Sequence, residues 1–194
     1  MNPGITIAAV LMLSASAAAA APPAPPEALI ARALSAAPPA VAAGAAVMTI
    51  DAAGRMAALR SGANGWTCLP YDVGTPTESP LCLDRNGLAW LEAVMAGRTP
   101  DPAAVGLSYM LQGGSVWSNL HGDATRPEPG QTAGLAIPPH VMVLSAAVAA
   151  ASGYPSGQVS PDTSRPFVLL GGTPQAVVIL PVGGWPPRLP SQAP

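Results

Sequence analysis

Apolar residues recur with a helical period in two segments of the chain, residues 27–37 and 88–96. The apolar positions are Leu29, Ile30, Ala33 and Leu34 in the first segment and Leu88, Leu91, Val94 and Met95 in the second. Because residues three and four positions apart share one side of a helix, both segments are predicted to be helices with one apolar face. Asp84 or Asn86 is expected to cap the second helix, and Gly97 to end it in the left-handed conformation.

Short apolar runs between turn residues predict strands. The runs cover residues 45–51, 56–60, 66–69, 105–112, 139–144, 167–170 and 175–182. Most connections between them are short and carry Gly, Asn, Asp or Pro, which favours antiparallel neighbours. Residues 146–151 are expected to form a short helical turn, and residues 115–137 a long irregular excursion. The sequence therefore predicts an α+β domain: a mainly antiparallel sheet of about six to seven short strands, with two helices packed on one face.

The two ends of the chain differ in composition from the middle. Residues 1–20 contain an apolar run followed by small residues in an Ala-x-Ala pattern, which is typical of a cleaved signal peptide. No basic side chain precedes the run, so an uncleaved anchor is the alternative, although a membrane span needs roughly 20 apolar residues. Residues 21–26 are predicted to be a Pro-rich linker, residues 27–182 one domain, and residues 183–194 a disordered Pro/Gly tail. We therefore expect a periplasmic or secreted protein with no membrane insertion after signal cleavage.

Cys68 and Cys82 are the only cysteines. In an exported chain they predict one disulfide, and closing a loop of about 15 residues stabilises a fold by about 3 kcal/mol in the chain-entropy model. The alternative is a pair of reduced thiols in a cytosolic protein, which requires residues 1–20 not to be a leader. The chain has neither a CxxC nor a CxxCH motif, so nothing indicates a thioredoxin-type enzyme or covalent haem.

Charge argues against polyanionic partners. The chain has eight Arg and no Lys, a net charge of −2, and basic residues that are scattered singly. No basic stripe could neutralise a run of phosphates, so nucleic-acid binding is not expected. The sequence contains no Gly-rich phosphate loop or dinucleotide fingerprint, and we predict no cofactor.

The two histidines, His121 and His140, are the candidates for metal binding. With Asp123 they could supply three ligands. The simpler interpretations are a solvated loop histidine for His121 and a hydrogen-bonded core histidine for His140. A serine nucleophile has weaker support, because the segment around Ser108 lacks the second glycine of a Gly-x-Ser-x-Gly elbow.

Methionines and aromatic residues suggest binding surfaces. Met48, Met110 and Met142 fall on predicted strands, where core filling is the common role, although extracytoplasmic copper sites also use Met and His. The candidate binding residues are Trp66, Tyr109, Gln112, Trp117, Asn119, His121 and His140, with Trp117 expected to be an exposed aromatic. We predict a non-enzymatic envelope module that binds a small molecule or an envelope protein. The alternatives are a periplasmic hydrolase or metal-dependent enzyme using His140, His121 and Asp123, and a purely structural protein.

Several short segments between about residues 40 and 182 occur in a characteristic order. They are Asn64-Gly65-Trp66-Thr67-Cys68, Pro80-Leu81-Cys82-Leu83-Asp84, Gly106-Leu107-Ser108-Tyr109-Met110-Leu111-Gln112-Gly113, Ser118-Asn119, Pro139-His140-Val141-Met142, Gly172-Thr173-Pro174 and Pro181-Val182. This order resembles an uncharacterised family of exported bacterial proteins, which implies a periplasmic or secreted address and no particular activity. The chain has Leu120-His121 where the family usually has Asp-Pro, and Gln175-Ala176-Val177 where it tends to have Tyr-Ala-His.

Overall fold

The computed structural model describes residues 24–51, 53–71 and 76–183. Its helices are α1 (Pro26–Leu34), α2 (Pro39–Ala42), α3 (Arg85–Met95) and α4 (Ala146–Ala151). Its strands are β1 (Ala46–Ile50), β2 (Met56–Arg60), β3 (Thr67–Leu69), β4 (Leu81–Leu83), β5 (Gly106–Met110), β6 (Gly114–Val116), β7 (Leu135–Ile137), β8 (His140–Leu144), β9 (Phe167–Leu169) and β10 (Val177–Pro181). All of the predicted leader, and all but Gly183 of the predicted tail, lie outside the described residues.

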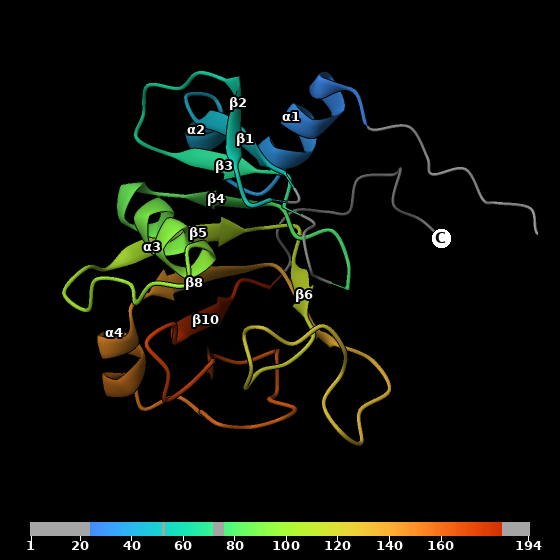
Figure 1. The fold of residues 1–194 in the computed structure, drawn as a ribbon, viewed down its shortest axis with the longest axis vertical. Coiled ribbons are helices and arrows are strands. Elements are labelled where there is room, and N and C mark those ends of the chain that lie inside the picture. The colour runs from blue at the N-terminus through green and yellow to red at the C-terminus, as the bar shows by residue number, and fades with distance from the viewer. Residues whose placement is uncertain (1–23, 52, 72–75, 184–194) are drawn as a thin grey trace, which may run out of the picture.

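The main sheet confirms the predicted α+β class. It has eight strands in the order β2-β1-β3-β4-β5-β8-β10-β9, and neighbours are antiparallel except for the parallel pair β1–β3 (Figure 1). A second sheet pairs β6 with β7, so the excursion predicted over residues 115–137 begins and ends in strand. The count exceeds the prediction within the main sheet because residues 81–83 form β4, which is held by partners on both sides.

The predicted placement of both helices on one face of the sheet is wrong. Cys82 pairs with Tyr109 and faces α1, whereas Leu83 pairs with Ser108 on the opposite face, where α3 packs. Successive strand residues point to opposite faces, and all three residues of β4 are buried. A strand that is apolar on both sides needs cover on both sides, so α1 and α3 occupy different faces.

Three apolar clusters follow from this layering. The largest lies under α3 and contains Phe167, Leu83 and Ile179, each at most 1% exposed. On the other face, one cluster surrounds the cysteines under α1, and a smaller one lies under α4. None of the described helices is both long enough and apolar enough to span a bilayer.

The ends of α3 follow the predicted capping pattern. Asp84 Oδ1 accepts hydrogen bonds from the N–H of Gly87 at 2.7 Å and of Leu107 at 3.1 Å. At the other end Gly97 has φ 65°, and the N–H of Arg98 donates to Ala93 O at 2.8 Å, which is the Schellman arrangement. The N-terminal helix α1 is shorter than predicted, because the chain leaves the helix at Ser35, whose hydroxyl donates to Arg32 O at 2.7 Å.

Candidate functional site

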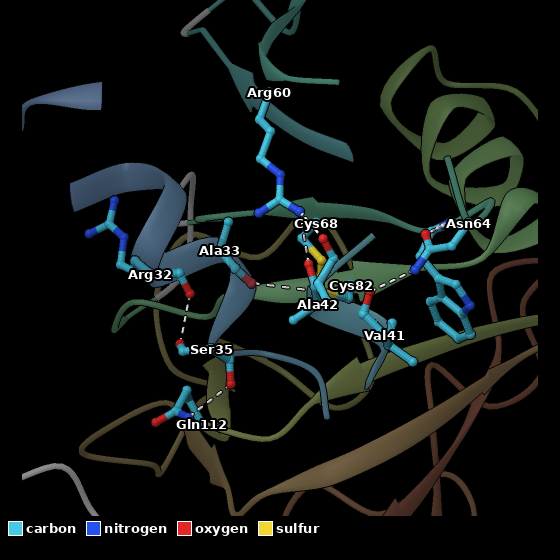
Figure 2. Close-up of a disulfide and its surroundings, with 12 residues drawn as sticks. Arg32, Ala33, Ser35, Val41, Ala42, Arg60, Asn64, Cys68, Cys82 and Gln112 are labelled. Carbon is cyan, nitrogen blue, oxygen red and sulfur yellow. Dashed lines mark hydrogen bonds between the residues drawn. A yellow bond between two sulfur atoms is a disulfide. The ribbon is translucent and has the colours of Figure 1, made fainter. Parts of the chain in front are cut away.

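The two cysteines form the predicted disulfide. Cys68 and Cys82 are directly opposite each other in β3 and β4, with Cα atoms 3.9 Å apart, and both are fully buried. Helix α1 lies over the bond, and Cys82 Sγ is 3.6 Å from Ala33 O (Figure 2). Alanine at position 33 allows this approach, because a larger side chain would hold the helix away from the sulfurs.

Three of the predicted binding residues lie around this disulfide. Trp66 packs on Tyr109, with ring centroids 5.1 Å apart and planes tilted by 36°. Gln112 Nε2 donates to Ser35 O at 2.9 Å, at the end of α1 (Figure 2). Asn64 Nδ2 also donates to Val41 O at 2.7 Å. These contacts attach the helical N-terminal segment to the sheet.

The loop between β6 and β7 contains a polar cluster that sequence reasoning missed. Ser118 Oγ accepts from the N–H of His121 at 2.9 Å and donates to Glu128 Oε1, and His121 Nδ1 is 2.7 Å from the same carboxylate oxygen. The hydrogen bond from Ser118 has the largest effect in lowering the pKa of Glu128, and the one from His121 has the next largest. Glu128 lies seven residues after His121 in a Pro-rich stretch, and this spacing matches none of the metal-binding or catalytic patterns considered above. The Glu128 carboxylate therefore links two parts of the loop, because it binds both Ser118 and His121.

Asn119 and Trp117 have surroundings that differ from an exposed binding loop. Asn119 is 1% exposed; its side-chain Nδ2 donates to Gln158 O at 2.7 Å, and its backbone carbonyl accepts from Leu170 N at 2.9 Å. It clamps the segment after α4 to the β9–β10 turn. Trp117 is half-buried, whereas Tyr154 is the exposed aromatic among the described residues, with 41% of its surface accessible.

His140 is buried in the sheet at 1% exposure. Its Nδ1 is 2.7 Å from Pro138 O and donates to it, while Nε2 has no hydrogen-bond partner in the described part of the chain. Burial lowers the pKa of His140 to about 4, against a smaller opposing effect of the Pro138 carbonyl, so the ring is neutral near pH 7. The described residues contain no group of three His, Cys, Asp or Glu that could hold a metal, so His140, His121 and Asp123 do not form the predicted ligand set.

A cleft of about 440 Å³ lies beside α4. Its walls are α4, the segment of residues 153–156, Val168 of β9 and the β9–β10 turn. The small alanine and glycine residues leave space for the cleft, and Tyr154, Ser156 and Thr173 carry hydroxyl groups. The lining contains Ala149, Ala150, Tyr154, Ser156, Gly172 and Thr173. None of the residues that line the cleft carries a charge.

Hydrogen bonds between residues close in sequence fix the cleft walls. Ser152 Oγ donates to Ala149 O at 2.8 Å and accepts from Tyr154 N at 3.2 Å, which sets the direction of the chain after α4. Thr173 Oγ1 donates to Leu170 O at 2.8 Å and accepts from Gln175 N at 3.2 Å. Gly172 has φ 81°, and a Cβ there would meet no atom within 4 Å, so the turn leaves this side open.

No protein-family model, curated protein or solved structure matches this chain. Fold and site alone define its class: a disulfide-containing α+β domain with an uncharged cleft at one end of its sheet.

Proposed function

We propose that the protein is an exported, non-enzymatic binding module that holds a small uncharged molecule in the cleft beside α4. The observation that carries this proposal is a hollow of about 440 Å³ walled by small side chains and three hydroxyl-bearing residues. Ligand pockets typically measure roughly 300–1,000 Å³ and combine apolar walls with a few polar groups. The cleft has this size and this composition.

The chemistry of the lining supports an uncharged, mainly apolar ligand. Alanine, valine and glycine surfaces favour contact with hydrocarbon, and the hydroxyls of Tyr154, Ser156 and Thr173 can donate to or accept from one alcohol or carbonyl group. A charged ligand would lose water without gaining an opposite charge, which is costly. The ligand therefore has a compact apolar body and one hydrogen-bonding group.

The walls are held in place without a ligand, which reduces the entropy cost of binding. Val168 N donates to Pro155 O at 2.8 Å, so the segment after α4 lies along the edge strand β9. Asn119 fixes the continuation of that segment through Gln158 O. Gly171 approaches Ser156 so closely that any Cβ there would collide with the serine hydroxyl.

Three features support an address outside the cytoplasm. The leader-like residues 1–20, the resemblance to exported proteins and the buried disulfide are each expected of a protein that crosses the inner membrane. In that compartment the protein meets small molecules before they enter the cell. Recovery of the protein from periplasmic and cytoplasmic fractions of its host, with mass analysis of the mature N-terminus, tests this part of the proposal.

Two-dimensional NMR of the full chain, titrated with cyclohexanol and cyclohexanone as uncharged probes, tests the cleft. We expect saturable shifts of the amides of Tyr154, Gly172 and Thr173. Ala150→Leu should abolish them by filling the hollow, since Ala150 is an exposed residue of the lining. Ala147→Leu is the matched control, because Ala147 is exposed on the same helix but outside the lining. Absent shifts, or shifts that survive Ala150→Leu, would contradict the proposal.

A further inference from the structure

Two buried polar atoms without hydrogen-bond partners in the described chain share the α3 face of the main sheet. They are His140 Nε2 and Ser108 Oγ, on residues that are 1% and 0% exposed. Their common face follows from the register, in which Ser108 is opposite Met142 and Met110 is opposite His140. Since buried polar atoms in folded proteins nearly always have a partner, these two atoms are candidates for contact with a bound group.

Two methionines neighbour His140 on the same face of the sheet. Met110 is directly opposite His140 in β5, and Met142 is two residues along β8, so all three residues point to the same face. Directly opposed residues of antiparallel strands have Cβ atoms about 4.5–5.5 Å apart, and same-face neighbours along a strand are roughly 7 Å apart. Flexible methionine side chains at these separations can reach one ion together with an imidazole. Strands β5 and β8 lie side by side in Figure 1.

The hydrogen bond at Nδ1 prepares the ring for coordination. Pro138 O can only accept, so the proton is on Nδ1 and the lone pair of His140 is on Nε2. A backbone carbonyl that fixes the tautomer and orientation of a histidine in this way is typical of the second shell of a metal site.

The donor types select the ion. Two thioethers and one imidazole are soft, uncharged donors, which suit Cu(I), whereas zinc sites use thiolate, imidazole and carboxylate. A monovalent ion also suits this place electrostatically, because burying a divalent ion among uncharged donors costs more. We propose that His140, Met110 and Met142 form a site for Cu(I).

The three proposed ligands differ in exposure, and this difference gives the ion a route into the site. Met142 is half-buried, while Met110 and His140 are at most 8% exposed, so an ion arriving at Met142 can pass to the two inner donors. The cysteines cannot compete for it, since their sulfurs are bonded to each other on the opposite face. The cleft beside α4 also lies on that opposite face, so this site is independent of the proposed ligand site.

Anaerobic competition of the full chain with bicinchoninate for Cu(I) tests the proposal. The wild-type protein should take one Cu(I) per chain, and X-ray absorption should show sulfur scatterers beside nitrogen. Loss of even an outer-shell partner weakens a metal site by roughly 10–100-fold, so Met110→Leu and Met142→Leu should each weaken binding by at least about tenfold. These substitutions conserve volume and leave the fold intact, which circular dichroism verifies.

Met48→Leu is the matched control, because Met48 packs against the same core cluster but lies on β1, away from His140. It should leave Cu(I) affinity unchanged. Equal weakening by Met48→Leu and Met142→Leu would overturn the proposal, as would a wild-type chain that takes no Cu(I) or an absorption spectrum without sulfur. Preference for Zn²⁺ over Cu(I) would overturn the choice of ion.

Discussion

The backbone of Gly87 in α3 lies directly against Gly106 in β5, with no side chain between them. A Cβ added to Gly106 would be 2.5 Å from Gly87 N and 2.6 Å from its Cα. Neither glycine has a positive φ, so the constraint is steric and not conformational. This contact sets how closely α3 approaches the sheet over the buried Ser108.

Gly106→Ala should therefore destabilise the protein by about 1–3 kcal/mol, the usual cost of forcing extra atoms into a packed core. Gly183→Ala is the control, since a Cβ there would meet no atom within 4 Å and φ is not positive. Urea unfolding followed by circular dichroism measures both. Equal stability of the two variants would show that α3 can move away from the sheet at little cost.

Removal of the disulfide should cost about 3 kcal/mol, because its loop restricts the unfolded chain. The double variant Cys68→Ala with Cys82→Ala measures this loss by urea unfolding against the oxidised parent. Because both cysteines are 0% exposed, the folded parent should also resist dithiothreitol that reduces it readily in urea. Rapid reduction without denaturant would contradict the cover that α1 provides.

The stability of the metal-free protein should fall in mild acid because of His140. Burial lowers the pKa of His140 from 6.5 to about 4, so the unfolded chain takes up a proton that the folded chain excludes. Above pH 6.5 the ring is neutral in both states and folding carries no penalty from this proton. As the pH falls from 6.5 to about 4, protonation of the unfolded chain progressively lowers the free energy of unfolding. The shift corresponds to roughly 3 kcal/mol.

Urea unfolding between pH 4 and 7.5 checks this, with two histidine variants for comparison. His140→Leu should flatten the profile between these limits. His121→Gln should leave it close to that of the parent, since His121 is 63% exposed on its side chain. A parent whose stability does not change over this range would contradict the burial of a neutral ring.

Asn119→Ala should loosen the segment that walls the cleft. It removes the hydrogen bond to Gln158 O, whose carbonyl then loses its donor, at a cost of about 1–2 kcal/mol. Asn86→Ala removes a similar bond, from Nδ2 to Val105 O at 2.9 Å, but in an exposed place where water can replace it. Amide exchange should therefore quicken at residues 156–159 in the first variant only. Unchanged exchange there would show that Asn119 is not the clamp.

Short local sequence patterns predict several features of the fold. The cap at Asp84 and the C-terminal Gly97 of α3 are each decided by a few adjacent residues, and the sequence predicts both of them. The cysteine pair also could be predicted, because a chain with two cysteines permits one intramolecular pairing.

What the sequence could not show depends on long-range packing. Strand β4 is three residues long, and its pairing partners rather than its composition make it a strand. Periodicity identifies the apolar side of α1 and α3 but not the face of the sheet that each covers. Glu128 joins Ser118 and His121 only after the loop closes, and the cleft forms where alanines and glycines from separate segments meet.

Helix α1 imposes an order on maturation. Helix α1 is synthesised before either cysteine, yet in the folded protein it covers the sulfur–sulfur bond. An oxidant therefore has to act while the first helix is still undocked. Once the helix has settled, the cross-link is out of reach of catalysts that shuffle or reduce thiols.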